Sequence, residues 1–325
     1  MGHQIDGQLA PWEAVADAHP WRNLLAGNGL SRQVWPSFAY TSLYERACET
    51  KALTKKDRAL FEARGTENFE LVLSALATSI ETLAALGRGT DALEKRYASV
   101  QGALGRAVRD VHAPMSDVPE ERRAALRAAL LEYRYVFTTS YDLLVYWAAA
   151  PDFADFADFF WSDGRNAFDP GRTRVSPTVP TRIAYLHGAL HLVVDGAGVT
   201  TKRRSGEQTL LEQFDDQPPP SRPLLITEGS SADKLKVIVN NEYLNFALTR
   251  LRRQKPPLVV FGHALGPQDQ HLVDALNVQP ERPIAVGLLP GPVAEVRARQ
   301  GELRGALTAH ELYFYDATTH PLGRV

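Results

Sequence analysis

The sequence predicts an α/β protein with a mostly parallel sheet of about six strands and a helical subdomain inserted near its beginning. Strand-like apolar runs alternate with helical segments, which is typical of strands joined by right-handed crossovers. Runs such as Leu258 to Phe261 and Ile284 to Leu289 are apolar almost throughout. Strands of that kind are covered on both faces, as in a parallel sheet between two layers of helices.

The first strand is expected just before a glycine loop that contains Gly27 and Gly29. A helix follows over about Ser37 to Glu49, and apolar residues then recur at helical spacing from about Asp57 to Leu131. This long helical block comes before the second strand. We therefore divide the chain into a sheet domain, residues 1–45 and 132–325, and an inserted helical subdomain, residues 46–131.

The second half of the chain repeats the alternation of strand and helix. The stretch "RIAYLHGALHLVV" is interpreted as a strand that runs into a turn at Gly188, rather than as a helix whose His187 and His191 hold a metal. The other predicted elements are a strand at 135–138 followed by a helix, a short strand near 223–229 and one helix over 232–254. Strands are then predicted within 258–261, 283–289 and 311–317, with a helix after each of the first two. A polar, proline-rich excursion is expected at about 196–222.

Composition excludes several classes of protein. Hydrophobic residues make up 44% and charged residues 23%, a balance typical of soluble globular proteins. The net charge of −2 gives no electrostatic footprint for nucleic acid. The single cysteine, Cys48, excludes a disulfide framework and a zinc site built from four thiolates. No signal peptide or membrane-spanning run is found, so we expect a cytoplasmic protein that binds neither membrane nor nucleic acid.

Small and hydrogen-bonding residues follow four of the predicted strands. Ligands of open α/β sheets bind at the carboxyl ends of strands, where such loops converge. We therefore expect Gly27, Asp142, His187 and Gly262 to line one cleft. The four loops are Gly27 to Ser31, Thr138 to Asp142, His187 to Gly188, and Gly262 to Asp269.

Other interpretations of the same residues stay open. The Gly27-x-Gly29 pattern permits close approach of backbone N–H groups to a diphosphate, but it also occurs in ordinary tight turns. It lacks the third glycine of a dehydrogenase fingerprint, and the chain has neither a P-loop nor a Gly-x-Ser-x-Gly nucleophile motif. Asp142 and Asp269 are also placed to cap helices. The single histidines are interpreted as structural, namely His263, His271 and His310.

In this order the four loops resemble the sirtuin-like superfamily of NAD-consuming enzymes. The similarity is greatest to a bacterial, zinc-less group with patterns such as LLxGNGxS, TTNYDLLxYW, LHGALHL and VVFGHSLGPQDxH. They correspond to Leu24–Ser31, Thr138–Trp147, Leu186–Leu192 and Val259–His271, and the resemblance covers most of the chain. It implies a Rossmann-like fold that holds NAD as its substrate and needs no metal.

The resemblance also implies roles for individual residues. His187 matches the catalytic histidine, and Ser140 and Asp142 match the segment that lines the nicotinamide and its ribose. The residues implied in NAD binding are Gly27, Asn28, Gly29, Ser31, Thr139, Gly262, His263, Leu265 and Asp269. Two positions depart from the pattern, because Ser140 replaces an asparagine and Ala264 replaces a serine.

We therefore expect an NAD glycohydrolase (an NAD nucleosidase) that is slow or gated and acts in antiphage defence. The alternatives are a module that binds NAD or another nucleotide without turnover, and a structural subunit of a defence complex. The family resemblance and the size of the helical insert favour a homo-oligomer, with a protein partner from the defence complex as a further expectation.

Overall fold

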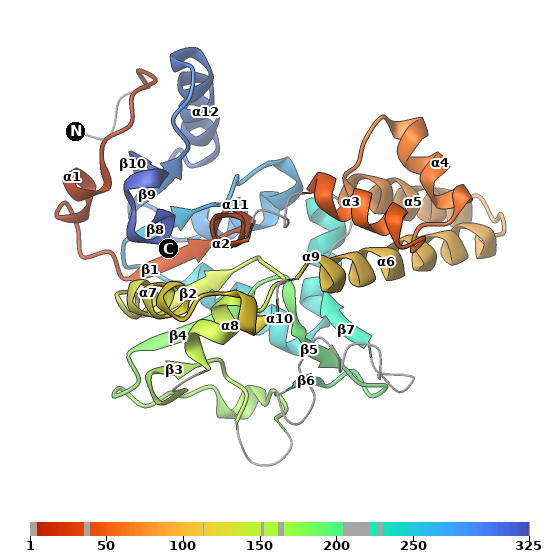
Figure 1. The fold of residues 1–325 in the computed structure, drawn as a ribbon, viewed down its shortest axis with the longest axis horizontal. Coiled ribbons are helices and arrows are strands. Elements are labelled where there is room, and N and C mark those ends of the chain that lie inside the picture. The colour runs from red at the N-terminus through yellow and green to blue at the C-terminus, as the bar shows by residue number, and fades with distance from the viewer. Residues whose placement is uncertain are drawn as a thin grey trace.

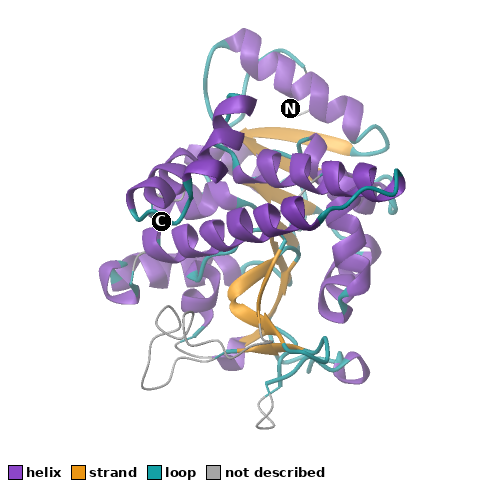
Figure 2. Ribbon diagram, turned by 90° about the vertical axis from the view of Figure 1, so that its right-hand side faces the viewer, coloured by secondary structure: helices purple, strands orange, loops and turns teal. Residues whose placement is uncertain are grey.

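The structure, a computed structural model, confirms the α/β class (Figure 1). It describes residues 5–35, 40–112, 114–150, 153–161, 166–203, 222–226 and 230–324. A seven-stranded parallel sheet forms the centre, and Figure 2 shows helices on both of its sides. None of the helices in these ranges combines the length and the apolar character needed to cross a membrane.

The order of the sheet, β10-β9-β8-β1-β2-β4-β3, places the first strand at its middle. From β1 the chain adds β2 and then β4 on one side, and later returns to pair β8 with the other side of β1. Six of the strands thus follow the Rossmann order 3-2-1-4-5-6, and the direction of winding reverses at β1. The strands are β1 (Asn23–Ala26), β2 (Tyr135–Thr138), β3 (Phe156–Ala157), β4 (Thr181–Tyr185), β8 (Leu258–Phe261), β9 (Pro283–Leu288) and β10 (Glu311–Asp316).

Burial explains why the central strands β1 and β8 are apolar except for Asn23 at the start of β1. All four residues of β1 and all four of β8 are buried, because helices cover both faces of the sheet. At the edge, β3 has only two residues and adds a short seventh strand to the six that were predicted.

The helices fall between the strands. They are α1 (Trp12–Ala16), α2 (Asn28–Val34), α3 (Tyr40–Glu49), α4 (Lys55–Arg64), α5 (Phe69–Ala85), α6 (Asp91–Val111), α7 (Glu120–Leu131), α8 (Leu144–Ala149), α9 (Ser231–Asn240), α10 (Glu242–Arg253), α11 (Gln270–Asn277) and α12 (Val293–Ala306). Of the helix expected over 37–49, residues 37–39 lie outside the described ranges.

Between β1 and β2 the described residues, 27–35, 40–112 and 114–134, contain no strand. The helices α3 to α6 pack into a group that projects to one side of the sheet, whereas α7 packs against α8 (Figure 1). The boundary expected at residue 46 therefore falls within α3. The last helix of the expected subdomain, α7, lies with the sheet domain.

The single helix expected over 232–254 is wrong, because the chain forms α9 and α10 with a break at Asn241. This residue has an extended backbone, and its side chain accepts a hydrogen bond from the N–H of Leu244 at 3.0 Å. Asparagine at this position caps α10, so a new helix begins although the apolar spacing continues across the break.

A second sheet, which the sequence did not predict, follows His187. It is antiparallel, with the order β6-β5-β7, and consists of β5 (Gly188–Val194), β6 (Thr200–Lys202) and β7 (Arg222–Leu225). The short strand expected near 223–229 is β7. Most of the predicted proline-rich excursion lies outside the described residues.

Gly188 joins the two sheets and separates the two histidines. Its φ is +78°, and a Cβ there would lie 1.8 Å from the carbonyl oxygen of Leu224, so only glycine fits. His191 lies in β5, fully buried between the rings of Tyr146 and Tyr185. Its ring nitrogens have no partner among the described residues, and only His187 reaches the cleft described below.

Candidate active site

A cleft of about 470 Å³ opens where β1, β2, β4 and β8 end, at the reversal in strand order. Rossmann-type sheets bind their ligands at this point. Its volume lies within the usual range for a small-molecule site. The described lining residues are Asn28, Gly29, Arg32, Leu43, Val108, Thr139, Ser140, Tyr141, Asp142, His187, Lys234, Gly262, His263, Ala264, Gly266, Gln268, Asp269, Gly287, Leu288, Leu289 and Arg299.

Most of the residues singled out from the sequence lie on this cleft. They are Asn28, Gly29, Thr139, Ser140, Asp142, His187, Gly262, His263 and Asp269. Three others, Gly27, Ser31 and Leu265, are not among the lining residues. Ser31 instead contacts Ser140 and Asp142, while Leu265 is buried with a φ of +48°.

The three predicted glycines form a seam between the loops after β1 and β8. The N–H of Gly27 donates to Phe261 and that of Gly29 donates to Gly262, both at 2.9 Å. A Cβ on Gly29 would lie 2.5 Å from the Cα of Gly262. Backbone packing therefore requires these glycines whether or not a diphosphate binds, and two of the N–H groups expected to face a diphosphate are already engaged.

A cluster of two serines and one aspartate forms the wall beside β2. The Ser31 and Ser140 hydroxyls lie 2.8 Å apart, and each donates to the Oδ2 of Asp142. The other oxygen, Oδ1, accepts the N–H of Leu144 at 2.8 Å, as in a helix cap. Three donors thus fix a carboxylate that is 2% exposed.

A second polar cluster reaches the same cleft through His187. The Nε2 atoms of His187 and His271 lie 3.0 Å apart, and the Nδ1 of His271 lies 3.0 Å from the Oγ of Ser231. The same Oγ accepts the backbone N–H of His271. This chain joins the end of β4 to the first turns of α11 and α9.

Asp269 does not cap α11 through its side chain, contrary to one interpretation of the sequence. Its Oδ1 accepts from the Nζ of Lys234 at 3.0 Å, and its Oδ2 lies 3.6 Å from the Nε2 of His263. Burial alone raises the pKa of Asp269, but His187, Lys234 and His263 together lower it to about 2. Asp269 is therefore an anion paired with the buried ammonium of Lys234.

The two facing histidines are neutral at pH 7. Burial lowers the pKa of His187 well below its ordinary value, and the Lys234 ammonium lowers it further. Burial also lowers the pKa of His271, to about 4. A neutral imidazole carries one N–H and one lone pair, so each ring can donate one proton and accept another.

His187, Asp269 and His271 also include the residue types of a metal site, with ligand atoms within 4.8 Å of one another. The ammonium of Lys234 lies on the carboxylate that would be the third ligand. A dication at this position would have to displace or repel that ammonium. This electrostatic arrangement favours a hydrogen-bonded cluster over a metal centre.

Sequence reasoning missed Ser231, Lys234 and the role of His271. Lys234 and Ser231 lie on α9, in a segment read only as an amphipathic helix. His271 was interpreted as structural, although it follows Asp269 by two residues in the same loop and helix start. That spacing was the one available signal that His271 belongs to the site.

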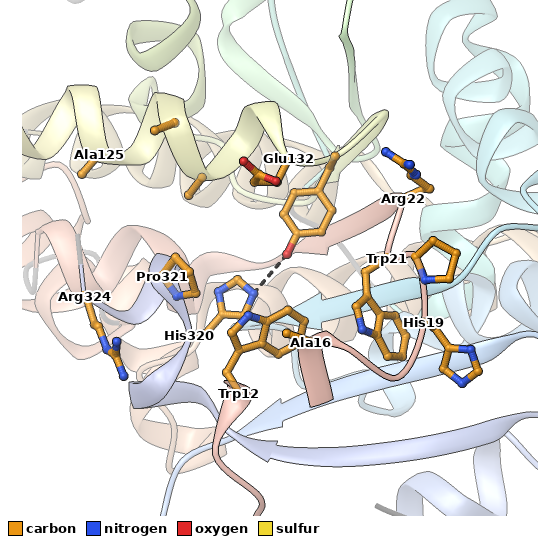
Figure 3. A pocket seen from close by; sticks show the side chains of 14 residues that line it. Trp12, Ala16, His19, Trp21, Arg22, Ala125, Glu132, His320, Pro321 and Arg324 are labelled. Carbon is orange, nitrogen blue, oxygen red and sulfur yellow. Dashed lines mark hydrogen bonds between the residues drawn. The ribbon is translucent and has the colours of Figure 1, made fainter. Parts of the chain in front are cut away.

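A larger hollow of about 770 Å³ lies beside the residues that precede β1 and β2 (Figure 3). It is lined by α1, α7 and the segment after β10, with Trp12, Trp21 and His320 among its rings. The ring nitrogens of Trp21 and His320 are bonded to the protein itself. The Nε1 of Trp21 donates to Val15 at 2.9 Å, and the Nε2 of His320 lies 3.0 Å from the hydroxyl of Tyr133.

Comparison with known families gives one match. The model of a domain of unknown function, DUF4917, matches residues 24–321, which include all of the parallel sheet except Asn23 and all four loops of the cleft. No curated protein matches the chain. The description of the family assigns no activity, so the sirtuin-like resemblance stays a prediction.

Proposed function

The chain belongs to the DUF4917 family, and we propose that it is an NAD glycohydrolase that splits NAD into nicotinamide and ADP-ribose. One observation carries the proposal. Asp142 and His187, taken from two loops of the predicted motifs, line one cleft at the reversal point of a Rossmann-ordered sheet. Cleavage of an N-glycosidic bond needs a fixed leaving group, a base and shelter from bulk water.

Asp142 is suited to hold the nicotinamide carboxamide. A carboxylate offers about four acceptor positions, and Ser31, Ser140 and Leu144 fill three of them. The remaining position accepts one N–H of the carboxamide. Because its three protein donors also fix the orientation of Asp142, the ring would be held in a defined place as its bond to ribose breaks.

His187 is suited to take a proton from water or from a ribose hydroxyl. Its ring is neutral at pH 7, so a lone pair is available without prior deprotonation. Besides the Lys234–Asp269 ion pair, the cations Arg32 and Arg299 line the same cleft and favour a ligand that carries phosphates. These charges support a dinucleotide over an uncharged substrate.

The insert offers a means of gating this activity. Leu43 of α3 and Val108 of α6 belong to the cleft wall, so the position of the insert bears on access to the site. An NAD hydrolase without control would deplete the NAD of its own cell, so a gate is expected. We include in the proposal a cytoplasmic, homo-oligomeric effector of antiphage defence whose assembly or partner moves the insert.

The test is incubation of the full chain with NAD while nicotinamide release is followed by chromatography. Wild type should release nicotinamide, slowly or after activation, and His187→Ala should release none above background. Binding of NAD is measured in parallel by calorimetry. A wild type that binds NAD and leaves it intact under every condition overturns the enzyme proposal.

A module that binds a nucleotide without turnover is the second candidate. The observation that favours it is the engagement of both serine hydroxyls by Asp142, which leaves Ser140 little freedom to contact a ligand. This candidate predicts retention of intact NAD by wild type and by Ser140→Asn. Release of nicotinamide by either protein excludes it.

A further inference from the structure

A hydrogen-bonded chain runs from Ser231 through His271 to His187, and nothing in the proposed reaction requires it. All three residues belong to different elements, and the two histidines are 84 residues apart in the sequence. His187 is 3% exposed and His271 is 2% exposed. Burying a polar ring without a hydrogen-bond partner is costly, which explains why each histidine has a partner. It does not explain why the partner of His187 at the cleft is a second histidine.

The protons of this chain can be arranged in two ways. Between two neutral rings with facing Nε2 atoms, one nitrogen must donate and the other accept. If Ser231 donates to the Nδ1 of His271, then His271 donates to His187, and the Nδ1 of His187 carries a proton. If His271 donates to Ser231 instead, His187 donates to His271 and its Nδ1 holds a lone pair.

The Nδ1 of His187 is the atom that these arrangements control. It has no hydrogen-bond partner among the described residues, and it is not a fully buried atom. Because His187 lines the cleft, Nδ1 is the ring nitrogen available to a ligand there. The two proton arrangements therefore present the ligand with either a donor or an acceptor.

We propose that His271, held by Ser231, positions the ring of His187 and determines which of its nitrogens carries the proton. His271 is a positioning residue that acts only through His187. The role in catalysis rests on the proposed function, whereas the control of the proton position does not. In the arrangement where His271 donates to Ser231, His187 is ready to act as a base. A proton taken up at Nδ1 would leave Nε2–H bonded to His271.

Asp269 and Lys234 support this arrangement from the side. The carboxylate of Asp269 lies near both rings and makes a positive charge on them less costly, while the ammonium of Lys234 opposes it. Lys234 acts more strongly than Asp269 on His187, whereas Asp269 acts more strongly than Lys234 on His271. The pair therefore makes a positive charge less costly on His271 than on His187. The same ammonium disfavours a metal shared by the two histidines.

Three variants test the proposal in the full chain. His271→Leu removes both hydrogen bonds of the chain and keeps a side chain of similar volume. His271→Gln restores a polar group that is able to reach His187. Ser231→Ala breaks only the far bond, and it keeps the capping box of α9, which is made by Ser230 and Asp233. The readouts are the ring-nitrogen NMR signals of His187, which report its tautomer, and the kcat, KM and pH profile of NAD cleavage.

His187 should hold one tautomer in wild type and in His271→Gln, and a mixture in His271→Leu. We expect kcat to fall roughly 10–100-fold in His271→Leu with KM changed less than about threefold, because only the reactive proton position is lost. The kcat of His271→Gln should return to within about fivefold of wild type, and Ser231→Ala should fall between them.

Two results overturn the proposal. The first is an unchanged His187 tautomer and pH profile in both His271→Leu and Ser231→Ala. The second is one equivalent of tightly bound zinc in wild type that is lost in His271→Leu, because the pair would then be a ligand set. If wild type does not cleave NAD, the proposed function fails, while the NMR signals still decide the role of His271.

Discussion

The hollow and the cleft differ in what their walls offer. The hollow is larger, about 770 Å³ against about 470 Å³, and it is rich in aromatic rings. Two of those rings, Trp21 and His320, have a ring nitrogen bonded to a neighbouring protein group. Both spaces have charged groups in their walls, but the cleft has more of them: two carboxylates, two imidazoles and three cationic side chains.

The difference arises from the direction of the strands. The hollow adjoins the starts of β1 and β2, whereas the cleft lies at their ends, where the loops of four parallel strands converge. Distant segments line both spaces, but only the cleft lies where the order of the strands reverses. We therefore choose the candidate site by the place of the cleft in the sheet and the chemistry of its side chains rather than by cavity size.

The largest effect should come from Asp142→Ala in the cleft. Loss of the carboxylate frees the carboxamide and leaves the Ser31 and Ser140 hydroxyls unpaired, so NAD cleavage should fall at least about 100-fold, or about 3 kcal/mol. The matched change in the hollow is Glu132→Ala, which should leave the rate within about twofold. Initial rates of nicotinamide release are measured for both variants. An equal loss of rate in the two would contradict the assignment of the reaction to the cleft rather than the hollow.

Gly262→Ala should have the next largest effect, on folding stability rather than chemistry. Its φ is +63°, and a Cβ would meet the backbone N of Leu30 at 2.6 Å. We expect the free energy of unfolding to fall by about 2–4 kcal/mol. Gly291→Ala, which has open space around its Cβ, should change it by less than about 0.5 kcal/mol. Urea denaturation measures the free energy of unfolding of both variants. Equal values would contradict the close backbone contact between the loops after β1 and β8.

Acid should destabilise the cleft through His271. Its pKa lies at about 4 in the folded chain, below the 6.5 of a free histidine. As the pH falls, the unfolded chain therefore binds a proton on His271 before the folded chain does. The free energy of unfolding decreases for this reason between pH 6.5 and pH 4. His271→Gln should reduce that loss by about 2 kcal/mol.

The check is the free energy of unfolding measured between pH 7 and pH 4. Gln270→Ala, next to His271 on α11, removes no titrating group and should keep the slope of wild type. If the slopes of His271→Gln and wild type coincide, the buried ring of His271 does not control the acid response of the cleft.

The smallest effect should come from Ser140→Asn. An amide at this position adds a donor and an acceptor beside Asp142, so the rate of NAD cleavage should rise by up to about tenfold, or about 1 kcal/mol. Ser140→Ala, which removes the hydroxyl without adding an amide, should not raise it. A lower rate in Ser140→Asn than in Ser140→Ala would show that the space beside Ser31 does not admit the amide.

Much of the parallel sheet and of the cleft could be predicted, because both depend on local sequence. Buried strands such as β1 and β8 are mostly apolar, and the residues after each parallel strand must lie at the same edge of the sheet. Asp142 and His187 were placed together on that reasoning alone. The break at Asn241 was missed because the apolar spacing of α9 continues into α10.

The rest depends on contacts between distant segments. Nothing near His271 in the sequence indicates that its partner is His187, and nothing near Lys234 indicates Asp269. The antiparallel sheet was missed for a similar reason, since β7 pairs with β5 across a long separation. The sequence predicts Gly27, Gly29 and Gly262 at the cleft but not their contact with one another, because that contact depends on how two loops pack.

His187 lies at the junction of the two sheets, and this has a thermal consequence. The N–H of Leu186, just before it, donates to Thr138 of the parallel sheet, while the carbonyl of His187 accepts from Ile226, next to β7. Folding thus removes the backbone entropy of this histidine before any ligand arrives. Warming that melts only the smaller sheet would release the histidine while the parallel sheet stays folded. Heat inactivation and global unfolding should then have separate midpoints.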